Sequence, residues 1–354
     1  MLMTPDELLH IRLHNQLLSL HTLKAPREVV ARMGAMQSQA LEMAKWAIGS
    51  RLPESSAKEI TGALNRGEVI RTHILRPTWH FVAADDLRWM YALSYPRLKP
   101  VYRSYAKMLD ADESLLYPHI PLIEELLSGG RHLTKQEIGV ALVERGVRLG
   151  DDHLSLLLSF TELEGIIVNG ELTGSRQTFT LLDEWVPRIP DISREEALAR
   201  LARRYFTSHG PATLQDFAWW SNLPITECRQ ALEMIRPDFI RESIDGRECW
   251  MPNDTRTPPS DHDSALLLAP FDEFVVSYKD RSGMIEEAHY AKVITKNGIF
   301  SPTIMLNGRI IGTWKKSMKK NLPQITLTFF EKASIKTATL FEPEIERLEK
   351  FYAQ

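Results

Sequence analysis

Several features that would define a common class of protein are scarce or missing in this sequence. Among its 354 residues there are 2 cysteines, Cys228 and Cys249, and neither has a second cysteine or a histidine at the spacing of a zinc site. No apolar run approaches the roughly 20 residues that a membrane span needs. The N-terminal segment is helical and mixed in charge, which does not resemble a secretory signal. We therefore expect a cytoplasmic protein in a reduced compartment, with no membrane partner.

The common catalytic fingerprints are also missing. The chain has no GxGxxG, no GxxxxGK[ST] and no GxSxG motif, so nucleotide-dependent chemistry and the common serine hydrolases lack support. His10 and His14 are four residues apart on an expected helix, but no glutamate follows His10 in an HExxH arrangement. We expect no metal and no cofactor.

What the sequence does contain is a repeated order of elements. After a first helix, three shorter helical segments are followed by a β-hairpin, and the order of three helices and a hairpin recurs twice more, as in winged-helix proteins with a helix-turn-helix and a β-wing. The expected helices cover 4–17, 26–35, 40–51 and 55–66, then 121–128, 134–145 and 151–164, and finally 193–207, 213–220 and 225–235. The expected wings cover 69–82, 165–182 and 239–251.

Beyond a linker rich in Pro, Asp and Ser, at residues 252–264, the pattern changes to β. Asn307-Gly308 marks a hairpin turn there, and a last helix is expected over 342–352. The predicted fold is α+β, with three tandem winged-helix units at 1–110, 111–190 and 191–252 and a C-terminal antiparallel, barrel-like β domain at 264–354.

Charge is distributed unevenly in this β region. Residues 288–330 contain no Asp or Glu, and such a basic stretch on a hairpin can follow a phosphate backbone. The alternative is an edge strand whose lysines prevent aggregation. The predicted DNA contacts are Arg309, Trp314, Lys315, Lys316, Lys319 and Lys320.

The first wing carries a second group of candidate DNA contacts, namely Arg71, His73, Arg76 and His80. Residues two apart on a strand share a face, so Arg71 and His73 can line a groove. Two histidines and two arginines without a carboxylate pattern suit an anionic surface better than a metal. A structural hairpin with incidental charges is the alternative.

Gln37 and Gln39 stand at the entrance of a helix. Within a helix, residues two apart point about 200° away from each other, but with extended backbone at Gln37 both amides can face one point. Each amide then offers a donor and an acceptor to a bound water. The alternative is that one glutamine satisfies a buried backbone group while the other is exposed.

A pair of adjacent carboxylates, Asp272 and Glu273, lies in the segment PFDEFVVSYKDRS. On a strand they would face opposite ways, which argues against a paired acid and base. We expect Asp272 or Asp280 to anchor a turn or to pair with Arg281.

Four stretches together resemble the bacterial winged-helix DNA glycosylases of the AlkZ and AlkX type. They are MQSQALEMAKWAIGSRL, IRTHILRPTWHFV, PFDEFVVSYKDRS and NGIFSPTIMLNGRIIGTW, in this order along nearly the whole chain. Members carry a Gln-x-Gln or Gln-x-Asp motif, so the resemblance implies that Gln37 and Gln39 are the catalytic pair. The crosslink-acting branch usually has an apolar residue between the glutamines, where this chain has Ser38.

The resemblance implies a monofunctional DNA glycosylase that releases alkylated, cationic N7-alkylpurines, in some members including the unhooking of interstrand crosslinks. Its partner would be double-stranded DNA containing alkylated bases, and we expect a monomer associated with the nucleoid. The alternative function is a non-catalytic winged-helix DNA-binding protein or regulator, in which the two glutamines only cap and pack.

Overall fold

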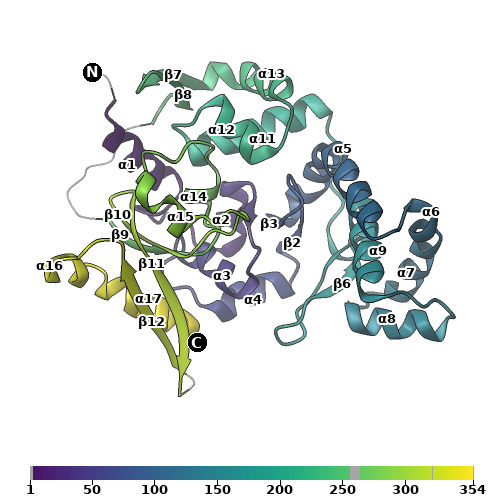
Figure 1. Cartoon of the computed structure of the whole chain (residues 1–354). Helices are drawn as coiled ribbons and strands as arrows, with labels where there is room; N and C mark the ends of the chain where they lie inside the picture. Colours follow the sequence, from purple (N-terminus) through teal and green to yellow (C-terminus); the bar gives the residue numbers. More distant parts are fainter. Residues whose placement is uncertain (1–2, 256–263, 321, 354) are drawn as a thin grey trace. The chain divides into compact units, whose positions relative to one another are not determined.

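The chain folds into two units. The computed structural model describes residues 3–255, 264–320 and 322–353. One compact unit combines Met1–Ile60 with Leu198–Gln354, and the other is Thr61–Ala197 (Figure 1). Most of the expected linker, residues 256–263, lies outside the described residues.

The first unit begins with short helices whose starts are set by local signals. Thr4 accepts a hydrogen bond from the Glu7 amide and Glu7 bonds back to Thr4, a capping box that fixes the first helix. The expected helices in this segment are confirmed with small shifts at their ends. The elements are α1 (Pro5–Asn15), α2 (Pro26–Met33), the short β1 (Met36–Gln37), α3 (Leu41–Gly49) and α4 (Ala57–Asn65), which runs into the second unit.

A three-helix segment followed by a hairpin continues the first unit, as expected. Asn222 takes the left-handed conformation that ends one helix, and Pro224 caps the next. Asp245 and Gly246 both have positive φ angles, which suits the tight turn of the hairpin. The elements are α11 (Arg194–His209), which starts in the second unit, α12 (Leu214–Ser221), α13 (Ile225–Ile235), β7 (Phe239–Ile244) and β8 (Arg247–Pro252).

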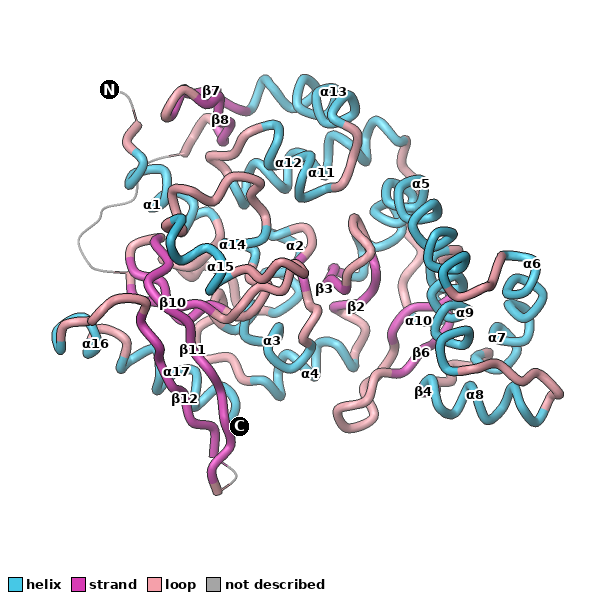
Figure 2. The backbone as a smooth tube through the Cα atoms, viewed as in Figure 1, coloured by secondary structure: helices cyan, strands magenta, loops and turns pink. Residues whose placement is uncertain are grey.

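The C-terminal part contains an antiparallel four-stranded sheet in the order β12-β11-β10-β9 (Figure 2). The expected barrel is wrong, because the two outer strands are not paired with each other among the described residues. The elements are β9 (Ala265–Leu268), α14 (Glu273–Val276), α15 (Tyr290–Val293), β10 (Thr303–Leu306), β11 (Arg309–Lys319), β12 (Leu322–Phe329), α16 (Ile335–Thr339) and α17 (Glu342–Ala353).

Helix α17 packs against β9 and β12 and covers one face of this sheet (Figure 1). Trp46 and Trp314 are buried there, and their indole nitrogens donate to the carbonyl oxygens of Leu267 and Leu268 in β9. Phe351 of α17 meets the Trp46 ring edge-on at 5.1 Å. Large aromatic side chains with satisfied polar groups thus join α3, the sheet and the last helix.

The second unit is organised around a 25-residue helix, α5 (Ala84–Met108), that the sequence did not predict. Pro96 and Pro100 lie inside it, and proline normally interrupts a helix because it lacks an amide hydrogen. Burial of Leu98, Tyr102 and Ala106 in the apolar core of the unit offsets this cost. No helix in the described ranges is long and apolar enough to cross a membrane.

The strands of the second unit form a hairpin and a small sheet, and the remaining elements are helices. The hairpin pairs β2 (Val69–His73) with β3 (Trp79–Ala83), as expected from the sequence. The sheet has the order β4-β6-β5. The elements are α6 (Glu113–Leu116), α7 (Ile120–Leu127), β4 (Leu133–Thr134), α8 (Lys135–Glu144), α9 (Asp151–Leu163), β5 (Ile167–Asn169), β6 (Thr178–Leu181) and α10 (Leu182–Trp185).

Candidate active site and nucleic-acid interface

The two glutamines lie in a non-helical segment just before α3. Gln37 ends the extended β1, and α3 begins at Leu41, so the backbone has the conformation that convergence of the two amides requires. Gln37 is 6% exposed and Gln39 is exposed. The exposure of Gln39 suits contact with DNA, and the burial of Gln37 is what the structural alternative expects of one of the two glutamines.

The backbone of this loop is attached to a residue that sequence reasoning did not single out as a partner. The Gln37 amide donates to Oε1 of Glu273 at 2.7 Å, and Glu273 is fully buried in the short helix α14. A pair of adjacent acids in an apolar segment was the available signal. The sequence pattern places both acids on a strand, where they would face opposite ways, whereas the segment is helical at this point.

The expectation for the neighbouring acid is confirmed in one of its two alternatives. Asp272 caps α14 through the Phe274 amide, so it does anchor a turn, but its ion-pair partner is Arg51 and not Arg281. Arg281 donates instead to the carbonyl oxygens of Val275 and Val276. The reason is that folding brings Arg51, from a distant part of the chain, next to the buried Asp272.

The candidate contacts on the first hairpin mostly bind within their own unit. The Arg71 guanidinium donates to Gln177 and lies 4.2 Å over the Trp79 ring. Burial lowers the pKa of Arg71 to about 10. His73 Nδ1 is 2.7 Å from a carboxylate oxygen of the buried Glu162.

The other two candidates on this hairpin differ in exposure. His80 is completely buried, with Nδ1 2.8 Å from the carbonyl oxygen of Thr78. Arg76, in the turn, is half-buried. His80 is therefore not a surface contact, and its prediction as a DNA contact is corrected.

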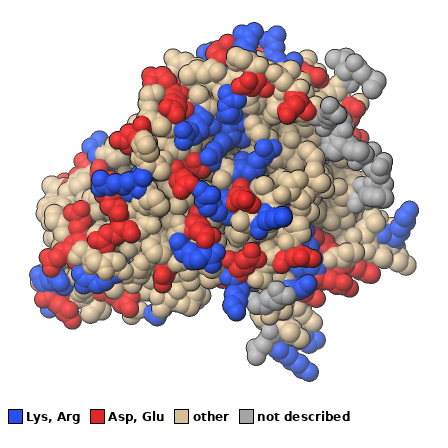
Figure 3. Space-filling model, turned by 180° about the vertical axis from the view of Figure 1, so that it is seen from behind, with Lys and Arg blue, Asp and Glu red and all other residues tan. Residues whose placement is uncertain are grey.

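The hairpin of β11 and β12 presents its lysines differently. Lys315, Lys319 and Lys320 are exposed, and Figure 3 shows basic side chains at the end of the projecting hairpin. Lys315 and Lys319 lie on the same face of β11 because they are four residues apart.

The other candidates in this region are engaged within the protein. Trp314 is 1% exposed and belongs to the core, so its prediction as a DNA contact is corrected. The Lys316 ammonium lies 3.4 Å from the centre of the Tyr352 ring, and burial lowers its pKa. Arg309 is exposed and forms an ion pair with Asp6 at 2.8 Å.

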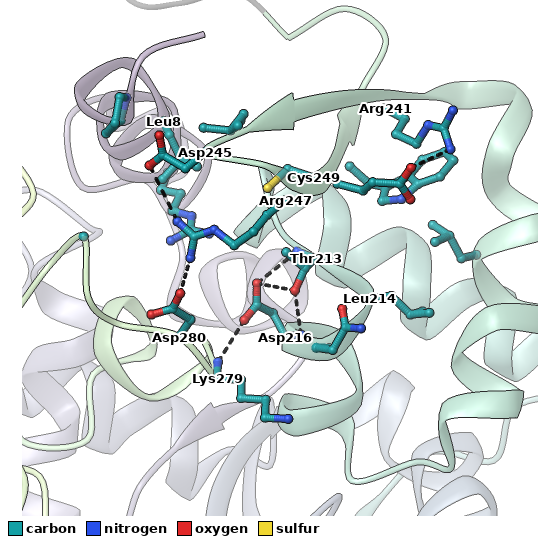
Figure 4. Close-up of a pocket in the computed structure, with 18 of the residues that line it drawn as sticks. Leu8, Thr213, Leu214, Asp216, Arg241, Asp245, Arg247, Cys249, Lys279 and Asp280 are labelled. Carbon is teal, nitrogen blue, oxygen red and sulfur yellow. Dashed lines mark hydrogen bonds and ion pairs between the residues drawn. The ribbon is translucent and has the colours of Figure 1, made fainter.

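A separate pocket of about 850 Å³ lies between α1, α12, the β7–β8 hairpin and residues 279–284 (Figure 4). Several of its charged groups bind each other: Arg247 pairs with Asp280, and Arg241 with Glu248. Asp216 accepts from Thr213 and from the Lys279 amide. These internal pairs do not form a set of polar groups that converge on one point, as a catalytic site requires. Nor do the described residues contain a group of three or more metal-ligating side chains.

Comparison with known proteins defines the class to which this arrangement belongs. The model of the family described as "DNA glycosylase AlkZ-like" matches residues 30–351. The chain is therefore a member of the AlkZ-like DNA glycosylase family, and an enzyme of DNA repair by that membership.

Two results concern particular relatives. The interstrand DNA cross-link repair glycosylase of Streptomyces sahachiroi is 23% identical over 331 residues, which cover 86% of this chain and 85% of the relative. The solved structure of the Streptomyces sahachiroi DNA glycosylase AlkZ superimposes with a TM-score of 0.80 at 19% identity, over 99% of this chain and 98% of that one. The α+β fold is thus that of AlkZ.

Proposed function

We propose that this protein is a monofunctional glycosylase that hydrolyses the N-glycosidic bond of N7-alkylated purines in double-stranded DNA, with Gln37 and Gln39 as the catalytic pair. The observation that carries the proposal is the position of these glutamines in a loop before α3, in a chain that belongs to a glycosylase family. Membership of the family alone would not assign the catalytic role to particular residues.

The proposed lesion explains why neutral side chains suffice. An N7-alkylated purine is already cationic, so it leaves as a neutral base without a general acid. The remaining tasks are to hold a water near C1′ and to stabilise an oxocarbenium-like state with oriented dipoles. The carbonyl oxygens of two amides can accept from that water and face the developing positive charge.

Binding of the duplex is assigned to the exposed lysines of the β11–β12 hairpin, with three winged-helix units at 1–110, 111–190 and 191–252 as the scaffold and a monomer as the acting species. Lys315, Lys319 and Lys320 support this assignment because they are exposed in a region without acidic residues. An interstrand crosslink is a second candidate substrate, because the Streptomyces relative is an interstrand DNA cross-link repair glycosylase.

Release of a base tests the proposal. The protein is incubated with a duplex oligonucleotide that contains one N7-methylguanine, and alkali then cleaves abasic sites. We expect a shortened strand with the wild type, none with Gln37→Ala/Gln39→Ala, and duplex affinity within about twofold. Gln136→Ala, which alters an exposed glutamine of α8, is the control and should remain active.

The same experiment addresses the non-catalytic alternative. A wild type that releases no base from N7-methylguanine, 3-methyladenine or crosslinked duplexes would contradict the enzymatic proposal. Loss of duplex affinity in the double variant would instead mean that the two glutamines are structural.

A further inference from the structure

The short helix α14 begins with two acidic side chains that are almost fully buried. Asp272 is 1% exposed and Glu273 is 0% exposed. A buried carboxylate costs free energy unless other groups in the protein bind it. The partners of each acid therefore indicate which parts of the fold the buried carboxylate holds together.

Glu273 lies against polar groups from three other segments of the first unit and accepts from the end of its own helix. It accepts from the Gln37 amide at 2.7 Å and from the Trp220 indole at 3.0 Å, and the Ser277 hydroxyl also donates to it. His209 Nε2 lies 3.6 Å away. The carboxylate thus joins the glutamine loop to α11, α12 and α14.

Asp272 makes the complementary connection, to the far end of α3. Both of its oxygens accept from Arg51, each at 2.8 Å. Arg51 also donates to Gln16 at 3.0 Å, and Gln16 donates to the Tyr278 hydroxyl at 3.0 Å. The segment 37–51 is consequently held at its beginning by Glu273 and at its end by Asp272.

We propose that Glu273 is a positioning residue for the glutamine pair, acting by holding the Gln37 amide. This inference rests on the proposed function of Gln37 and Gln39. A hydrogen bond to the main-chain amide of Gln37 fixes the peptide plane that carries the Gln37 side chain. The Gln39 side chain extends from the same short loop. Catalysis by oriented dipoles depends on such fixed geometry, and a displacement of about 1 Å can cost about 100-fold in rate.

The test is Glu273→Gln, which keeps the size of the side chain but replaces one acceptor oxygen by a donor amide. That amide would face donors such as the Trp220 indole or the Gln37 amide. Under single-turnover conditions we expect the maximal rate of base release to fall about 10- to 100-fold, while the enzyme concentration for half-saturation changes less than about twofold. Hydrogen exchange at residues 36–40 should become faster.

Glu344→Gln is the matched control, because Glu344 is also a buried acid of the first unit but pairs with Arg347 in α17. It should leave both the rate and the exchange at 36–40 unchanged. If Glu273→Gln does not fold, Glu273→Asp, which keeps the charge but shortens the reach, is measured with the same expectations.

The outcomes separate the two proposals. A wild type without base release contradicts the proposed function, whereas the exchange measurement still reports on the loop. An active wild type with unchanged rate and unchanged exchange in the folded variant overturns the role of Glu273. Equal losses in Glu273→Gln and Glu344→Gln would mean that changing any buried acid of the first unit slows base release, and would also overturn the inference.

Discussion

Two hairpins of this protein carry basic residues that look equivalent in the sequence but are used differently. In the β2–β3 hairpin, Arg71 and His73 bind Gln177 and Glu162 of their own unit. In the β11–β12 hairpin, Lys315 and Lys319 are exposed.

The difference shows that the number of basic residues on a hairpin does not define a nucleic-acid surface. A cation that already has a buried partner contributes to the stability of the fold, and only one that remains hydrated can exchange counterions with a phosphate backbone. The first hairpin therefore belongs mainly to the structure, and the second is the better candidate for binding.

The largest expected effect comes from removing the partner of the first hairpin. Glu162 is 1% exposed and accepts from the Thr72 hydroxyl at 2.6 Å and the His73 amide at 3.2 Å. Glu162→Ala should lower the free energy of unfolding by about 3 kcal/mol, because it leaves buried donors without an acceptor. Urea denaturation followed by circular dichroism measures this change, and the exposed Glu124→Ala is the control, with an effect within about 0.5 kcal/mol. A change as small as that of the control would mean that the hairpin does not depend on this carboxylate.

Helix α17, which packs against β12 of the second hairpin, contains a titratable group of its own. Burial raises the pKa of Glu344 in α17 from 4.5 to about 7. Between these pH values the folded state binds more protons than the unfolded state, so stability falls as pH rises through this window. Glu344→Gln should therefore raise the free energy of unfolding at pH 8 by up to about 3 kcal/mol, and this gain should disappear below about pH 4.5. Denaturation at a series of pH values checks it, and a gain independent of pH would contradict the assignment.

The third prediction concerns DNA. Lys315→Ala/Lys319→Ala should weaken binding to a duplex about tenfold at 0.1 M salt and flatten the dependence of log K on log salt by up to about 2, since each phosphate contact contributes about 0.9. Fluorescence anisotropy at several salt concentrations measures both. Lys332→Ala/Lys336→Ala removes two other exposed lysines and should leave the slope unchanged. If Arg71→Met flattened the slope equally, the two hairpins would not differ as described.

The smallest effect is expected for Lys316. Its ammonium already lies on the Tyr352 ring, so Lys316→Ala should change duplex affinity by about twofold at most, about the size of one surface charge interaction. The same anisotropy series detects this. A loss as large as that of the Lys315 and Lys319 pair would mean that Lys316 leaves the ring to bind phosphate.

Local patterns predicted most elements of the fold. The capping residue Thr4, the helix over Ile225–Ile235 and the turn at Asp245-Gly246 are encoded by neighbouring residues, and all three are confirmed. Helix α5 was missed because Pro96 and Pro100 argue against a helix locally. Its stability comes from the core residues that it buries, and a short stretch of sequence does not show which residues become buried.

The candidate site shows the same division. The sequence alone determined that Gln37 and Gln39 precede a helix and that residues 288–330 lack acids, because both are properties of contiguous chain. Only the tertiary structure decided that Glu273 binds the Gln37 amide, that Arg51 takes Asp272, and that Trp314 is buried. These pairings join residues more than 200 positions apart or depend on what covers a sheet, and they are selected by the requirement that every buried polar group find a partner.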